Sequence, residues 1–288
     1  MNSLEGARVA LLACGCYNPP TIMHLRMFES ARDFLEVRYG CEVVEGILSP
    51  VADYFGKPDL LPAIHRQVIS SQYKMSELAV KSSTWIRADQ WECTQQQWTK
   101  TLLVLLHFKQ VLARKYNNDT RLRLMLLCGG DVVDSFKRLT AEGGYLWDPQ
   151  DVGAIIRDFG LVVMARQNSE PMKTLSQLGY NGQSLANVFV FEDTVLPNDI
   201  SSTRLRAAIR RGESIKYCTM DSVVDYIRKH QLYRVKNNQA GNSLPFRVKR
   251  ADVDCLKNNW GFSDLQTWLI RKQGVPIAEV MVSYQIAE

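Results

Sequence analysis

The chain has 288 residues, of which 46% are hydrophobic and 23% charged, a composition that suits one large α/β domain or one domain with an appendage. Its formal net charge of +5 fits an anionic small substrate. Because no basic block interleaved with aromatic residues is present, the charge argues against nucleic acid as a partner. No apolar run approaches the roughly 20 residues of a membrane span.

Seven scattered cysteines, without a Cys-x-x-Cys pair, indicate reduced thiols and not a disulfide framework. The first residues lack the basic start and long apolar stretch of a signal peptide. We therefore expect a cytoplasmic protein, with the nucleus as a further location.

The strongest local pattern is a buried strand that leads through a glycine turn into a helix. The apolar run 9–13 is typical of a parallel strand covered on both faces. Gly15 lets the backbone approach a ligand, and Asn18-Pro19-Pro20 predicts a sharp turn. Thr21 is then the expected N-cap, with His24 in the first turn of the helix. The free backbone N–H groups of such a helix start favour an anion.

Strands and helices alternate along the rest of the chain to about residue 234. Further strands are expected at 41–49, 84–88, 121–128, 161–166 and 188–192. Further helices are expected at about 61–81, 94–116, 132–139, 149–158, 171–178, 199–212 and 221–230. This alternation predicts an α/β fold with a doubly wound parallel sheet over residues 1–234. Residues 235–288 read as a linker and a C-terminal extension whose structure the pattern does not define.

The residues that carry chemistry gather at the carboxyl ends of the predicted strands, where doubly wound sheets bind ligands. They are Gly15, Lys57, Trp91, Gly129, Asp131, Arg166 and Ser201. This clustering predicts an active site at that edge of the sheet.

Each candidate also has an ordinary structural explanation. His24 is either a donor or cation above a phosphate or a polar cap residue. The stretch 201–206 either holds phosphate oxygens with hydroxyls and guanidinium groups or is an N-cap followed by a solvated basic face.

Three further candidates leave the same choice open. The turn 129–131 either brings backbone and a carboxylate to a nucleotide or is a plain strand-to-helix turn. Trp91 either stacks on a cationic pyridinium ring or packs in the core, and Lys57 either meets an anion or is solvated. No Cys/His cluster with metal-ligand spacing is evident, so we predict no protein-bound metal.

The first motif, Gly-Cys-Tyr-Asn-Pro-Pro-Thr-Ile-Met-His over 15–24, resembles that of the animal nicotinamide mononucleotide adenylyltransferases, members of the nucleotidyltransferase superfamily. Other segments of the same family occur in order over residues 8–233, among them 128–136 and 198–206. Departures are mild: Cys16, Tyr17, Gly130 and Arg204 replace commoner residues, and a long insert of relatives near 114–121 is missing.

The resemblance implies a Rossmann-like nucleotidyltransferase fold and a role for each matching residue. It implies that His24 and Arg206 are catalytic. It implies ATP contacts by Gly15, Cys16, Tyr17, His24, Gly129, Asp131, Ser201, Ser202, Thr203 and Arg206. It implies contacts to nicotinamide mononucleotide by Tyr17, Lys57, Trp91, Glu92, Thr94, Leu146, Trp147 and Arg166.

The implied reaction transfers AMP from ATP, with Mg²⁺, to nicotinamide mononucleotide or nicotinic acid mononucleotide, giving NAD or deamido-NAD and pyrophosphate. We also expect a homo-oligomer. The alternatives are a sister transferase with another phosphate acceptor, which Trp91 and Trp147 disfavour, and a chaperone or interaction role served by Trp260, Phe262 and Trp268. The central geometric hypothesis is that two helix starts, one early and one late in the chain, meet at one triphosphate.

Overall fold

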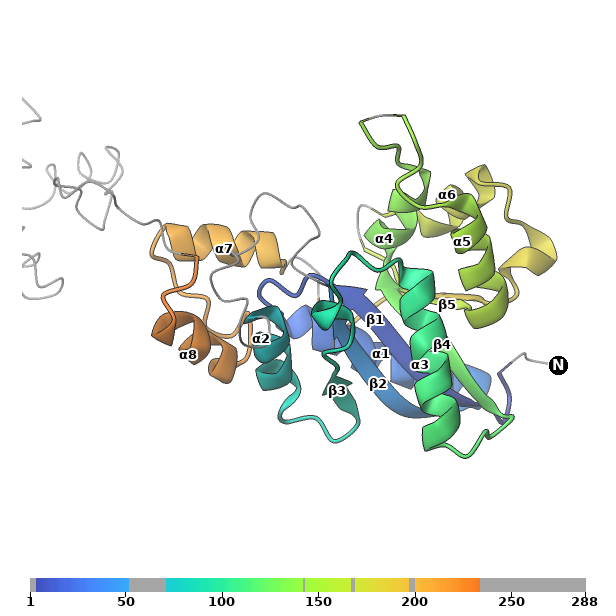
Figure 1. The fold of residues 1–288 in the computed structure, drawn as a ribbon, viewed down its shortest axis with the longest axis horizontal. Helices are drawn as coiled ribbons and strands as arrows, with labels where there is room; N and C mark the ends of the chain where they lie inside the picture. The colour runs from blue at the N-terminus through green and yellow to red at the C-terminus, as the bar shows by residue number, and fades with distance from the viewer. Residues whose placement is uncertain (1–3, 52–70, 142, 167–168, 197–199, 234–288) are drawn as a thin grey trace, which may run out of the picture. The chain divides into compact units, whose positions relative to one another are not determined.

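The computed structural model describes residues 4–51, 71–141, 143–166, 169–196 and 200–233, shown in Figure 1. The expectations for Lys57, for the first part of the helix predicted at 61–81, and for the extension with its aromatic residues lie outside the described residues. None of the described helices is long and apolar enough to cross a lipid bilayer.

The described residues form one parallel sheet of six strands in the order β3-β2-β1-β4-β5-β6. The strands are β1 (Arg8–Gly15), β2 (Glu42–Pro50), β3 (Ile86–Ala88), β4 (Leu122–Gly129), β5 (Leu161–Met164) and β6 (Val188–Phe191). On one side of β1 the chain adds β2 and then β3. It then crosses over and pairs β4 with the other side of β1. This is the predicted doubly wound arrangement, with the strand order reversing between β1 and β4.

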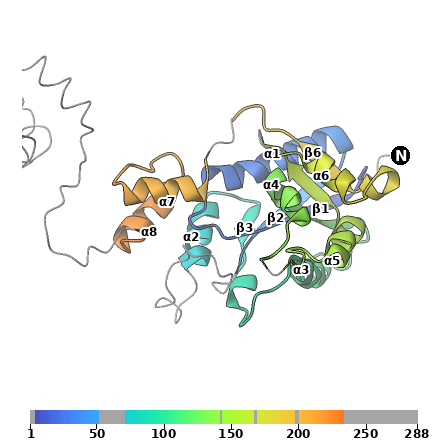
Figure 2. The ribbon, with the colours of Figure 1, turned by 90° about the horizontal axis from the view of Figure 1, so that it is seen from above.

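Eight α-helices connect and flank these strands within the described residues. They are α1 (Ile22–Tyr39), α2 (Ser71–Val80), α3 (Thr101–Lys115), α4 (Gly130–Asp134), α5 (Pro149–Ala154), α6 (Pro171–Gln177), α7 (Ser202–Arg210) and α8 (Asp221–Lys229). Figure 2 shows α1 on one side of the sheet and α3 with α5 on the other.

The alternation of side chains along β1 explains the two apolar layers. Val9 and Leu11 point into the layer that contains Phe28 of α1, whereas Leu12 points into the layer that contains Phe108 of α3. Because successive residues of a strand face opposite sides, a continuous apolar run is needed where both faces are covered. The core therefore lies on both sides of the sheet and leaves the carboxyl edge for polar residues.

A third apolar cluster joins α2, α7 and α8, which lie together in Figures 1 and 2. Its buried side chains include Met75, Leu205, Val223, Ile227 and Leu232. The cluster brings the last described residues of the chain back to the sheet.

The helix predicted from Thr94 is wrong in its start. A 3₁₀ turn occupies Glu92–Thr94, and α3 begins only at Thr101. The hydroxyl of Thr94 donates to the carbonyl of Trp91 (2.8 Å) instead of accepting from a helix N–H, and Gln95 is extended. A Thr hydroxyl bonded to its own turn competes with helix capping. The predicted start at 132 is also late, because α4 begins at Gly130.

Candidate functional site

The turn after β1 is shaped by Gly15 and Tyr17. Tyr17 has a left-handed φ of 41°, and its ring folds back so that a Cβ at Gly15 would lie 3.1 Å from the ring. The Tyr17 hydroxyl donates to the carbonyl of Ala13 at 2.8 Å, and the side chain is buried. A left-handed tyrosine is strained unless its surroundings hold it. Tyr17 therefore braces the turn in this structure, while its neighbour Cys16 is half-buried.

His24 is oriented by the N-cap of α1. The backbone N–H of Thr21 donates to Nδ1 of His24 at 2.9 Å, and the Thr21 hydroxyl lies 2.9 Å from the same nitrogen. Since Nδ1 accepts from a backbone N–H, the proton of the neutral ring is on Nε2. Desolvation, with the charge of Arg166, lowers the pKa of His24 to about 4. In this structure His24 is therefore a neutral hydrogen-bond donor at pH 7, not a cation.

The start of α7 is bound directly to the turn that precedes α1. Ser202 donates its hydroxyl to the carbonyl of Pro19 at 2.7 Å, and Arg206 Nη1 donates to the carbonyl of Asn18 at 2.8 Å. Ser201 caps α7, with its hydroxyl accepting from the backbone N–H of Arg204 at 3.3 Å. The structure thus places the starts of α1 and α7 side by side.

Thr203, the remaining hydroxyl residue of this helix start, is exposed. Arg206 Nη2 donates to the hydroxyl of Thr203 at 3.4 Å, so the guanidinium group is held between its own helix and the turn before α1. Hydroxyls, a guanidinium group and two helix N-termini are together the groups that bind phosphate oxygens in proteins.

The sequence analysis did not single out Tyr233, which also binds the turn before α1. Tyr233, the last described residue, donates its hydroxyl to the side-chain oxygen of Asn18 and contacts Met75 of α2. Thr219 donates to the carbonyl of Pro20 at 2.7 Å. Burial raises the pKa of Tyr233, so its hydroxyl stays a donor. No local pattern marks Tyr233, because its partner lies 215 positions away along the chain.

The ends of β4 and β5 bring Gly129, Asp131 and Arg166 together. Arg166 Nε lies 3.7 Å from a carboxylate oxygen of Asp131, and a Cβ at Gly129 would lie 2.5 Å from that oxygen. A Cβ at Gly130 would lie 2.3 Å from the hydroxyl of Ser169. Close packing therefore favours glycine at 130, where Ser169 fills the space, whereas a side chain at 129 would displace the Asp131 carboxylate. Within the described residues, Arg166 Nε is buried without a hydrogen-bond partner, and the cation lowers the pKa of His24, so the two groups share one electrostatic environment.

Glu92 joins the adjacent strands β1 and β2 near this edge of the sheet. It is 3% exposed, and its carboxylate accepts from the hydroxyl of Ser49 at 2.5 Å and from the thiol of Cys14. Burial raises the pKa of Glu92 to about 7, although both donors oppose that rise. In this structure Glu92 supports the edge of the sheet from below.

Trp91, directly before Glu92, stacks on an imidazole that the sequence analysis did not single out. The rings of Trp91 and His107 are 3.8 Å apart at an interplanar angle of 6°. His107 comes from α3, and no motif connects it with the loop after β3. The stack covers one face of the indole, and Trp91 as a whole is half-buried.

The other predicted aromatic residue is anchored separately. Trp147 donates its indole N–H to Ser135 at 2.9 Å and packs against Phe136, whereas Leu146 is 45% exposed. Lys100 pairs with Asp151 at 2.8 Å and with Asp148 at 3.3 Å, and so joins the segment before α3 to the start of α5. Trp91 and Trp147 both pack on the apolar layer beneath α3 and α5.

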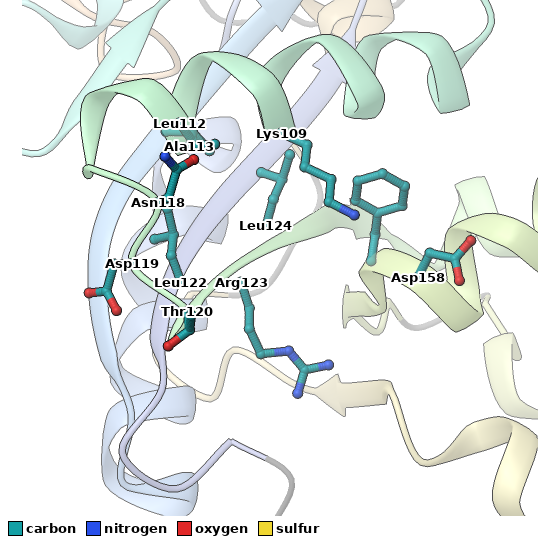
Figure 3. Close-up of a pocket in the computed structure, with 11 residues that line it drawn as sticks. Lys109, Leu112, Ala113, Asn118, Asp119, Thr120, Leu122, Arg123, Leu124 and Asp158 are labelled. Atoms are coloured by element: carbon teal, nitrogen blue, oxygen red, sulfur yellow. The ribbon is translucent and has the colours of Figure 1, made fainter.

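A cavity of about 330 Å³ lies at the opposite end of β4 from the predicted site (Figure 3). It is lined by the end of α3, by the turn at 118–120 and by the start of β4. Arg123 donates to Asn187 at 3.1 Å, Asp119 pairs with Arg8 at 3.2 Å, and Lys109 lies over the ring of Phe159. These charged side chains of the cavity thus already contact other residues of the protein, which is typical of a surface that serves the fold and not a ligand.

Comparison with known proteins finds a matching family profile and relatives that align over most of the chain. A sequence profile described as cytidylyltransferase-like matches residues 12–208. The chain is 46% identical over 228 residues to a nicotinamide/nicotinic acid mononucleotide adenylyltransferase 2 of Caenorhabditis elegans, covering 79% of this chain and 98% of that protein. It is 40% identical over 233 residues to a nicotinamide/nicotinic acid mononucleotide adenylyltransferase of Arabidopsis thaliana, covering 81% and 92%.

Among solved structures, the chain is similar to a Plasmodium falciparum nicotinic acid mononucleotide adenylyltransferase complexed with APC. The TM-score is 0.53 at 16% identity, over 79% of this chain and 97% of that chain. At this identity the likeness shows a common fold.

Proposed function

The chain belongs to the nicotinamide/nicotinic acid mononucleotide adenylyltransferases, and from that premise we propose how its described residues carry out adenylyl transfer. It is an enzyme of NAD biosynthesis that uses ATP and a pyridine mononucleotide. The observation that carries the residue assignment is the direct hydrogen bonding between the start of α7 and the turn before α1. That contact supports the assignment of donors from both ends of the domain to one phosphate site.

The transfer forms one bond and breaks one bond. The 5′-phosphate oxygen of the mononucleotide attacks the α-phosphorus of ATP, the bond to the β-phosphate breaks, and pyrophosphate leaves with that electron pair. We assign to His24 Nε2–H and Arg206 the role of donating to phosphate oxygens as their charge grows. Positioned donors of this kind contribute about 3–4 kcal/mol each to the transition state. Positioning and charge stabilisation then account for the reaction without a protein nucleophile.

Arg166 and Asp131 supply the second part of the assignment. The buried Nε of Arg166, which has no hydrogen-bond partner within the described residues, suits an anionic ligand above the sheet. Asp131 and the backbone at Gly129 suit the adenosine end, where a carboxylate accepts from ribose hydroxyls.

Magnesium belongs to the proposal as part of the MgATP substrate. Within the described ranges, no group of three or more His, Cys, Asp or Glu side chains is arranged to hold a metal ion. Mg²⁺ in nucleotide enzymes is commonly held by substrate phosphates, water and one or two carboxylates. The triphosphate and water would together supply most of its ligands.

The acceptor is proposed to bind at the aromatic side of the site. Trp91 offers an indole face for the pyridine ring, and Trp147, Leu146 and Thr94 belong to the same proposed wall. In this structure the Glu92 carboxylate is buried beneath that wall, so we assign it support of Trp91 from below. The expected homo-oligomer and the expected location in the cell stay predictions.

The test is a pyrophosphate-release assay with MgATP and one acceptor at a time. Nicotinamide mononucleotide and nicotinic acid mononucleotide are expected to support release, with formation of the matching dinucleotide. Phosphopantetheine is expected to support none, and activity with it instead would favour the sister transferase. The ratio of kcat/KM for the two mononucleotides measures the preference between amide and acid.

A further inference from the structure

Trp91 is held in place by its backbone as well as by its ring. Its N–H donates to the carboxylate of Asp89 at 2.9 Å. Its carbonyl accepts from the hydroxyl of Thr94 at 2.8 Å and from the side-chain amide of Gln95 at 2.7 Å. Three side chains thus fix the backbone from which the indole projects, and the remaining freedom is rotation of the ring.

The ring rotation is restricted by two aromatic residues of α3. The imidazole of His107 lies parallel to the indole at 3.8 Å, closer than most aromatic pairs. Phe108, which is fully buried, meets the indole edge-on at 6.4 Å and the imidazole edge-on at 5.1 Å. The three rings therefore form one packed unit in which the position of each determines that of the others.

The charge state of His107 matters for what the indole can bind. Burial lowers the pKa of His107, Asp89 from the loop after β3 acts in the opposite direction, and Arg114 on α3 lowers it further. The ring is therefore neutral at pH 7. A neutral imidazole leaves the π-face of the indole attractive to a pyridinium cation, whereas an imidazolium would compete for it.

We propose that His107 is a positioning residue that fixes the indole of Trp91 as a flat plate for the pyridine ring of the mononucleotide. The inference rests on the proposed function, because it assumes that the indole face opposite His107 receives that ring. His107 itself touches no substrate. It acts by limiting ring rotation before the acceptor binds, so its loss should affect acceptor binding and leave ATP binding alone.

The experiment compares three variants of the full chain, His107→Ala, His107→Leu and His107→Phe, with MgATP and nicotinamide mononucleotide. His107→Ala is expected to raise KM for the mononucleotide by roughly 3- to 10-fold, the range for one aromatic contact, with KM for ATP unchanged. His107→Leu fills the volume without a flat face and should resemble His107→Ala. His107→Phe restores a flat ring and should return KM for the mononucleotide to within roughly twofold of the original.

A matched control comes from α8, where His230 packs on Tyr226 with ring centroids 4.3 Å apart. His230→Ala removes a histidine–aromatic contact that is no part of the proposed acceptor wall, and it should leave both KM values unchanged. Equal rises in both KM values, or no rise in either, would show that the inference is wrong. If the unmodified chain forms no dinucleotide from any pyridine mononucleotide, the proposed function fails instead. If His107→Ala and His107→Leu do not fold, a His107→Phe protein with raised KM for the mononucleotide also contradicts the inference.

Discussion

The two sides of the site are held by different forces. At the proposed phosphate side, Ser202 and Arg206 donate to backbone carbonyls of the turn before α1, and Thr21 orients His24. At the proposed aromatic side, parallel and edge-on rings hold Trp91, and the hydrogen bonds to it from the described residues reach only its backbone. Directional bonds fix the orientation of a donor, whereas ring packing fixes the plane in which an aromatic side chain lies.

This difference predicts which kinetic constant a substitution on each side should change. Removing a donor at the phosphate side should lower turnover, because the transition state gathers charge there. Removing a ring at the aromatic side should weaken binding of the acceptor with less effect on turnover. The following experiments test that contrast, from the largest expected effect to the smallest.

His24→Ala should have the largest effect. Loss of the Nε2–H donor is expected to lower kcat by about 10²- to 10³-fold, as for other donors to a developing oxyanion. Steady-state kinetics with saturating MgATP and mononucleotide measure it, with a thermal melt to confirm folding. A well-folded variant with kcat near the original would remove His24 from the phosphate side.

Glu92→Gln tests the polar residue beneath the aromatic side. The pKa of Glu92 is raised to about 7, so the folded state holds its proton more tightly than the unfolded state between about pH 4.5 and 7. As the pH rises through that range, the unfolding free energy of the original protein should therefore fall by about 3 kcal/mol relative to that of the variant. Urea unfolding at pH 5 and pH 8 measures the difference.

Glu45→Gln is the matched control of opposite sign. Glu45 is also buried, and burial alone would raise its pKa, but the nearby Lys115 and Arg87 lower the net value. This carboxylate contributes stability above its unfolded pKa and loses it as the pH falls. Glu45→Gln should therefore be less stable than the original protein at pH 8, whereas Glu92→Gln gains there. Parallel behaviour of the two variants would contradict both assignments.

Trp91→Ala tests the acceptor wall. Stacking of a base on an aromatic side chain contributes about 1–3 kcal/mol, so KM for the mononucleotide should rise roughly 5- to 150-fold. KM for ATP should stay within about twofold. Trp98→Ala, at a 47% exposed tryptophan of the same segment, is the control and should change neither. A loss of kcat alone would place Trp91 outside the acceptor site.

Tyr233→Phe should have the smallest effect. It removes the donor to the Asn18 side chain and leaves a buried oxygen less well satisfied, at a cost of about 1–2 kcal/mol. Chemical unfolding measures the loss, and Tyr217→Phe at a 79% exposed tyrosine should show none. An unchanged unfolding free energy for Tyr233→Phe would mean that the hydrogen bond contributes nothing net.

The sequence could predict those features that depend on neighbouring residues in the chain, but not the contacts between distant segments. The strands follow from apolar runs, and the capping of α1 by Thr21 follows from the residues around it, because both depend on neighbours in the chain. The helix predicted at Thr94 is wrong because its hydroxyl serves the carbonyl of Trp91. His107 escaped notice because ring stacking between a loop and α3 leaves no local pattern.

Tyr233 has a consequence for synthesis of the chain on the ribosome. Asn18 is made early, yet hydrogen bonds to it come from Arg206 and Tyr233, which are made 188 and 215 residues later. Domains emerge over seconds, at about 5–20 residues per second, so the amino-terminal turn waits roughly ten seconds or more for these bonds. A nascent chain can therefore assemble much of its sheet while its proposed phosphate side is still incomplete, and catalytic activity should appear only once Tyr233 has left the exit tunnel.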